Sequence, residues 1–112
     1  MTNEEIRRMT DDDLDNLITQ KKNYLPEPII PPIRPTKDIH EAACLLGQLE
    51  RNGWERTDSA LIRTNDFPHA LVTQKAGVGI GFGCAKTLER AISEAVAMAL
   101  CKIEEVTTTS QE

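Results

Sequence analysis

The segment GVGIGFGCAKTLERAISEAVAMALCKI, residues 77–103, decides the fold, because its pattern changes from a period of two to a helical period within one short turn. In its first half, Val78, Ile80 and Phe82 alternate with glycines, which is typical of a β-strand with one apolar face. In its second half, apolar residues recur at helical spacing, and Thr87 is a suitable N-cap. The segment therefore predicts a strand, a tight turn and an amphipathic helix over residues 87–103.

Glycines occupy the other face of the predicted strand and leave its backbone bare. A packed helix, a partner chain or a flat ligand can approach such a face closely, and the sequence leaves these three open. The following helix begins at Lys86-Thr87, and helix N-termini attract anions. Gly81, Gly83, Lys86 and Thr87 are therefore candidate ligand-binding residues, although their spacing matches neither a Walker loop nor a dinucleotide fingerprint.

The second face of the predicted helix carries small apolar residues, including Ala97, Met98 and Cys101. Such a face can be buried against another copy of the chain. Self-association would also help a chain of 112 residues whose ordered core is only about two thirds of that length. We therefore expect a homo-oligomer, either a dimer or a larger assembly.

The N-terminal third of the chain predicts helix followed by an extended segment. Thr2 and Glu5 have capping-box spacing, and Thr10 followed by three aspartates is a second helix start within residues 2–22. Residues 23–36 hold five of the six prolines and should be extended, with polyproline II character. The isoleucines of this segment are too apolar for a free linker, so we expect them to lie along the domain or to reach a neighbouring subunit.

The remaining elements complete an α+β domain. Asp38 begins a helix that Asn52-Gly53 ends, and short strands follow from Trp54 and from His69 before the glycine-alternating strand. We predict an antiparallel meander of three to four strands, the first continuing as far as residues 61–63, with two amphipathic helices on one face. The predicted divisions are a helical segment (1–22), a proline-rich linker (23–36), an α+β core (37–105) and a disordered tail (106–112).

Composition excludes several classes of function. The net charge is −5, and residues 37–103 balance eight acidic against eight basic residues, so nucleic-acid binding is not expected. The N-terminus has no secretory signal, and no apolar run is long enough to span a membrane. Three widely spaced cysteines without a C-x-x-C pair fit a reducing cytoplasm and predict no metal site and no cofactor. The two histidines lie in no catalytic arrangement, so we expect no catalytic residues and no enzyme.

Four stretches of the chain resemble a known family: MTNEEI, DLDNLITQKK, PTKDIHEAACLLGQLERNGW and AKTLERAISEAVAMAL. They are similar to the phage ABA sandwich domain family, small bacteriophage and prophage proteins that are largely of unknown function. The resemblance implies a fold, a phage origin and a place in the host bacterial cytoplasm more than it implies an activity. The glycine-rich strand and the five-proline linker depart from the family pattern.

Two functions are weighed on these grounds. The first is a non-catalytic, oligomeric binder that sequesters a nucleotide-like immune signal of the host, an anti-defence sponge. Its site would add Arg56, Arg63 and Trp54 to the candidates at the helix start. The second is a protein-interaction or inhibitor module that acts through the proline segment or through the outer face of the last helix. Deleting residues 1–36 is expected to separate the two functions.

Overall fold

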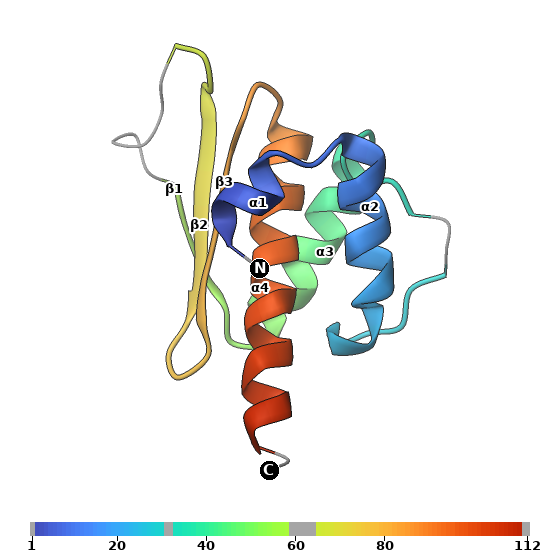
Figure 1. Cartoon of the computed structure of the whole chain (residues 1–112), viewed down its shortest axis with the longest axis vertical. Coiled ribbons are helices and arrows are strands. Elements are labelled where there is room, and N and C mark those ends of the chain that lie inside the picture. Colours follow the sequence, from blue (N-terminus) through green and yellow to red (C-terminus); the bar gives the residue numbers. More distant parts are fainter. Residues whose placement is uncertain (1, 31–32, 59–64, 111–112) are drawn as a thin grey trace.

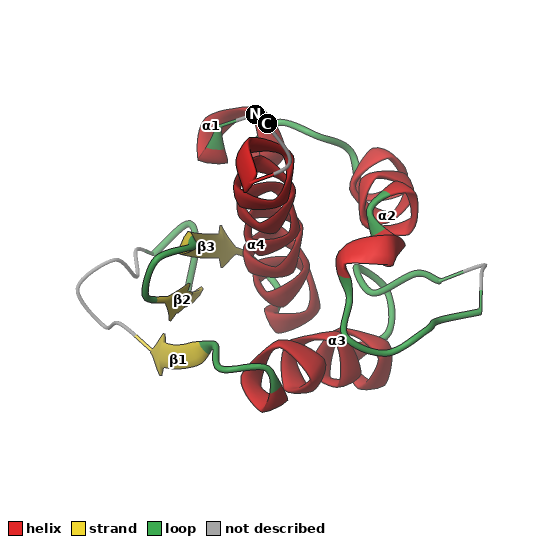
Figure 2. Cartoon of the chain, turned by 90° about the horizontal axis from the view of Figure 1, so that it is seen from below, coloured by secondary structure: helices red, strands yellow, loops and turns green. Residues whose placement is uncertain are grey.

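The computed structural model describes residues 2–30, 33–58 and 65–110 and has an α+β fold built around one central helix (Figure 1). Figure 2, a view from below, places this helix, α4, at the centre, with the sheet on one side and α2 on the opposite side, while α1 and α3 flank it in the other two directions. In chain order the elements are α1 (Asn3–Arg7), α2 (Asp11–Gln20), the 3-10 turn η1 (Lys22–Tyr24), α3 (Ile39–Arg51), β1 (Glu55–Asp58), β2 (His69–Lys75), β3 (Gly79–Ala85) and α4 (Leu88–Ser110).

The described strands form one antiparallel sheet in the order β1-β2-β3. The register aligns Thr57 with Val72 and Val72 with Phe82, so these three residues share one face of the sheet. This confirms the α+β class and an antiparallel sheet with sequential strands. The predicted continuation of the first strand through residues 61–63 lies outside the described residues.

Helix α4 is buried on all sides from Ala91 to Cys101. It packs against β3 and β2 on one side, and α1, α2 and α3 contact it elsewhere. Ala97 and Met98, on the face expected to meet a second copy, are 0% and 2% exposed within a single chain. The expected use of this face for a partner is therefore wrong, because the chain covers it with its own helices.

The bare face of β3 lies against α4. A Cβ atom added to Gly83 would come 1.8 Å from the carbonyl oxygen of Ala91, and one added to Gly81 would come 2.3 Å from that of Ala95. The sequence left open whether a helix, a partner chain or a ligand covers the glycine face. In the structure a helix of the same chain covers it. The apolar side chains of β3 consequently face away from α4, which leaves Ile80 52% exposed.

Helix α3 packs mainly against α4, so the expectation that two helices lie directly on the sheet holds only for α4. Its predicted ends are confirmed. Asp38 caps the N-terminus by accepting from the N–H of His40 at 2.9 Å. At the other end Gly53 has a φ of +96°, and the N–H of Trp54 bonds to the carbonyl of Leu49 at 3.0 Å.

The N-terminal helices have the predicted caps and belong to the same core. Thr2 and Glu5 exchange the two 3.2 Å hydrogen bonds of a capping box, and Thr10 caps α2. The large side chains that these helices bury completely are Ile6, Leu14 and Ile18. Residues 1–22, expected as a separate segment, therefore build part of the core.

The proline-rich segment is fastened at both ends instead of hanging as a linker. Both carboxylate oxygens of Asp15 accept from Thr36, from its N–H at 3.1 Å and from its hydroxyl at 2.8 Å. Near the start, the N–H of Glu27 donates to Gln48 at 3.2 Å, and its carboxylate pairs with Arg51. The segment thus bridges α2 and α3.

Helix α4 continues to Ser110, so the disordered tail expected from residue 106 is wrong for residues 106–110. The sequence after Glu105 has no glycine or proline that would end a helix. Residues 111–112 lie outside the described part. No helix within that part has both the length and the apolar character needed to cross a membrane.

Candidate functional site

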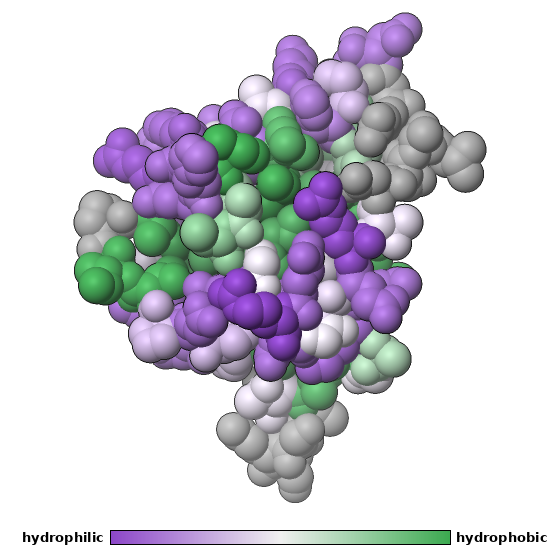
Figure 3. Space-filling view, turned by 180° about the vertical axis from the view of Figure 1, so that it is seen from behind, coloured by the Kyte–Doolittle hydropathy of each residue, from purple (hydrophilic) through white to green (hydrophobic). Residues whose placement is uncertain are grey.

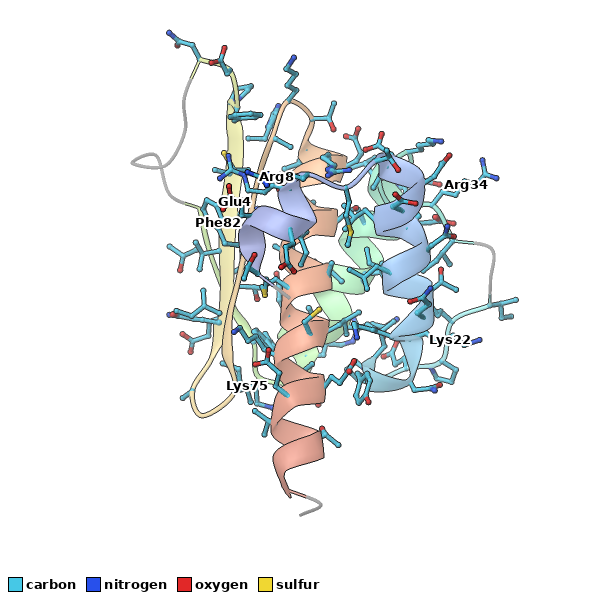
Figure 4. All side chains as sticks on the ribbon, in the orientation of Figure 1. Glu4, Arg8, Lys22, Arg34, Lys75 and Phe82 are labelled. Carbon is cyan, nitrogen blue, oxygen red and sulfur yellow. The ribbon has the colours of Figure 1, made fainter. Side chains whose placement is uncertain are left out.

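A hollow of about 1060 Å³ lies between α1 and the start of α4. Its charged and aromatic lining residues are four basic side chains (Arg7, Arg8, Lys86 and Arg90), three carboxylates (Glu4, Asp11 and Glu94) and two phenylalanines (Phe67 and Phe82). Figure 4 shows Glu4 of α1 and Arg8, the residue that follows α1, close to Phe82 of β3 on this side of the molecule. Two ends of the sequence, the first helix and the start of the last, therefore build one site.

Arg90 is the structural centre of the site. Its guanidinium pairs with Glu94 and with Asp11, each at 2.8 Å. It also donates to backbone carbonyls at the end of α1, including that of Met9 at 2.7 Å and that of Ile6 at 3.3 Å. With its side chain 13% exposed, Arg90 fastens the junction of α1 and α2 onto α4 and has little capacity left for a ligand.

Glu94 forms the buried floor of the hollow and is only 2% exposed. Its carboxylate accepts from Arg90 and from the N–H of Cys84 at 3.3 Å, which satisfies a backbone donor on the outer edge of β3. Burial raises the pKa of Glu94, while Arg90 acts in the opposite direction. Burial also raises the pKa of the Cys84 thiol, whereas an activated nucleophile needs a lowered pKa.

Two cations of the hollow, Arg7 and Lys86, form no salt bridge within the described residues, although the charge of Arg7 acts to lower the pKa of Glu94. Arg8 pairs with Glu4 at 2.7 Å, but Arg7 instead lies over the ring of Phe67, with 5.5 Å from guanidinium carbon to ring centroid. Lys86 is exposed at the start of α4. An anion placed between them would meet two positive charges, the positive end of the α4 dipole and aromatic surface.

The predicted site residues are only partly brought together. Lys86 lines the hollow, and Thr87 lines it too while capping α4 by accepting from the N–H of Arg90 at 3.2 Å. Gly81 and Gly83 are covered by α4, so their predicted role in touching a ligand is wrong. They instead set the distance between β3 and the helix whose start carries Lys86.

The other three predicted residues lie elsewhere. Trp54 is 3% exposed and belongs to the core, so its predicted role as a stacking surface is wrong. Arg56 lines a separate shallow hollow in which its neighbours include Glu50 and Glu55, which makes that place unfavourable for an anion. Arg63 lies outside the described residues.

Sequence reasoning missed Arg7, Arg8 and the two phenylalanines. The Arg7-Arg8 pair follows the first capping box, but nothing local indicates that this helix returns to the start of α4. Only the packing of α1 against β3 and α4 brings them there. Finding these residues therefore requires the tertiary contacts between segments about 80 positions apart in the sequence. The pairing of Arg90 with Asp11 is one such contact.

Within the described residues, no group of three or more histidine, cysteine, aspartate or glutamate side chains is placed to hold a metal ion. The chain matches no protein-family model, no curated protein and no solved structure. The similarity to phage ABA sandwich proteins therefore stays a prediction from the sequence.

Proposed function

We propose that this protein is a small non-catalytic binder of an anionic, nucleotide-like molecule, which it holds in the hollow between α1 and α4. The observation that carries the proposal is the placement of Arg7 and Lys86 in one hollow, where neither forms a salt bridge with a described carboxylate, in a chain whose net charge is −5. Cations beside a helix N-terminus favour phosphate, and Phe67 and Phe82 offer apolar ring surface for a base.

Sequestration follows from the same features. Arg90 and Glu94 compensate each other at the floor, and the pKa of the Cys84 thiol is raised, so the groups nearest the bound molecule favour holding it over reacting with it. In a phage setting, as the sequence resemblance implies, such a protein would lower the concentration of a host nucleotide signal.

The test is calorimetric titration with three probes: inorganic phosphate, ADP and cyclic diadenylate. The double variant Arg7→Ala, Lys86→Ala should weaken binding of the best probe at least about 10-fold, because two charge-assisted contacts are lost. Raising the salt concentration should also weaken binding by the wild-type protein. Lys22→Ala is the matched control, because this lysine lies away from the hollow (Figure 4).

The double variant should keep the wild-type melting temperature, because Arg7 and Lys86 are exposed. Lys22→Ala should keep it as well. Absence of binding by all three probes, or equal affinities of wild type and the double variant, would overturn the proposal. Native mass spectrometry of freshly purified protein adds a second route, because a stoichiometric extra mass on the wild type that is missing from the double variant would identify the ligand.

The alternative function is a protein-interaction or inhibitor module. Its predicted use of the outer face of the last helix is wrong, because that face is buried. The proline segment is favoured by one observation, the 89% exposure of Ile30.

A further inference from the structure

The back of the molecule carries an apolar surface that no element of the described chain covers (Figure 3). It is made by the proline segment and by the outer side of α3. Ile30 is 89% exposed, the largest value among the exposed large apolar side chains of the described residues. Beside it lies a groove of about 210 Å³ whose lining is mainly apolar and includes Ile29, Ile33, Cys44 and Leu45.

Described residues on both sides of Ile30 are attached to the domain. Ile29 and Ile33 are partly buried against the core on either side of Ile30. The contacts from Glu27 to Gln48 and from Thr36 to Asp15 anchor the segment further out. These attachments on both sides therefore keep Ile30 close to α3 and its groove.

The outer side of α3 has the shape for close helix packing. Ala43 and Cys44 are exposed in its middle, and only the guanidinium of Arg51 comes within 4 Å of a Cβ added to Gly47 among the described atoms. Small side chains at the centre of a helix face let a second helix approach closely.

One end of this face carries a histidine and the other end carries a glutamate. His40 is exposed near the N-terminus of α3 and Glu50 is exposed near its C-terminus, each five positions from Leu45. No described carboxylate or cation pairs with either side chain. Two α3 helices packed antiparallel about their midpoint would bring each His40 beside the Glu50 of the second copy and would also oppose the two helix dipoles.

We propose that this surface joins two copies of the chain in a two-fold symmetric dimer, with α3 against α3 and Ile30 of each copy in the groove of the other. A projection and a hollow side by side on one surface are the requirement for a closed, self-complementary interface. The contact is limited to one helix and one segment, so the dimer is a weak one, with a dissociation constant on the order of 10 µM.

The experiment is sedimentation equilibrium over a concentration series with three proteins. Wild type should form a dimer, and Ile30→Asp should raise the dissociation constant about 100-fold, because the interface buries two copies of this side chain. Ile80→Asp is the matched control. Ile80 is 52% exposed on the open face of the sheet, so its replacement should leave the dissociation constant unchanged.

Alkylation of one cysteine locates the interface. Cys44 is the exposed cysteine, next to the midpoint of α3 and in the lining of the groove, whereas Cys84 and Cys101 are buried. Alkylation of Cys44 by N-ethylmaleimide should therefore slow as the concentration of wild-type protein rises and the dimer covers this thiol, whereas Ile30→Asp chains should react at one rate at every concentration. A protein that stays monomeric at every concentration, or a dimer that Ile30→Asp leaves intact, would overturn the proposal. Binding of a different protein to this face without a dimer would also overturn it.

Discussion

Gly83 lies where the backbone of β3 touches the backbone of α4, and this single contact sets the geometry of the core. The absence of a side chain there is a packing requirement, because the φ angles of Gly81 and Gly83 are not among the positive ones. Gly77, in the β2–β3 turn, is the opposite case, since its φ is +80° and a Cβ would meet no atom within 4 Å. The glycines of one short strand and its turn thus serve two different needs.

Replacing Gly83 by alanine should destabilise the protein by about 3 kcal/mol or more, because the new Cβ would meet backbone that cannot move alone. The measurement is urea-induced unfolding followed by circular dichroism. Gly47→Ala is the control, because this helical glycine has only the flexible end of Arg51 near its Cβ position. That change should stabilise by about 0.5–1 kcal/mol. Equal stabilities of Gly83→Ala and wild type would contradict the close contact.

At the scale of elements, the proline segment is held by side chains of the two helices that it bridges. Asp15 is only 4% exposed and bonds to Thr36 through both carboxylate oxygens. Burial is the largest effect on this carboxyl group and raises its pKa, while the hydrogen bonds from Thr36 and the charge of Lys37 act to lower it. The hydrogen bonds from Thr36 and the charge of Lys37 therefore do not fully offset the cost of burying the negative charge of Asp15.

This predicts a specific pH dependence. Because the pKa of Asp15 is raised above its unfolded value of 3.8, the folded protein binds this proton more tightly, and stability falls as pH rises from that value through the folded pKa. Asp15→Asn keeps an acceptor and a donor for Thr36 without the charge. It should match or exceed wild-type stability at pH 7, by up to about 1 kcal/mol.

The measurement is the difference between the two stability curves from pH 3 to pH 7, and at acid pH the advantage of Asp15→Asn should disappear. The pKa of Glu94 is also raised by burial, but Glu94 is present in both proteins, so its contribution cancels in the difference. A variant that becomes less stable than wild type as pH rises would show that the hydrogen bonds from Thr36 outweigh burial.

The whole molecule depends on its N-terminal helices to close the core around α4. Ile6, Leu14 and Ile18 are each 0% exposed, although they come from segments expected to lie outside the main domain. Both helices contact α4, so without them part of the surface that α4 buries would be open to water. The experiment of deleting residues 1–36 therefore cannot separate the two functions, because it removes part of the fold.

Deleting residues 1–20 should abolish cooperative thermal unfolding and expose surface that binds the dye ANS. Three buried side chains contribute about 5–9 kcal/mol, which is comparable to the whole stability of a small domain. Truncation after Glu105 is the control and should cost less than about 1 kcal/mol, because it removes the last residues of α4, beginning with Val106, which is 37% exposed. A sharp transition near the wild-type temperature after the first deletion would contradict a shared core.

The sequence by itself determined the local structure. Caps at Thr2, Thr10, Asp38 and Thr87, the turn at Gly53 and the alternation in β3 act over a few residues, so pattern alone located the helices and strands. The end of α4 was misjudged because a polar segment without glycine or proline can continue a helix that is already formed.

Only the tertiary structure decided which faces meet. The glycine face of β3 could have been covered by a helix or by a ligand. The small apolar face of α4 could have been covered by a partner or by the chain's own helices. A sequence pattern predicts that a surface is buried, but it does not indicate which element buries it. The candidate site has the same origin. Lys86 and Thr87 are readable as a helix start, whereas Arg7 joins them through a contact that depends on the packing of α1 against β3 and α4.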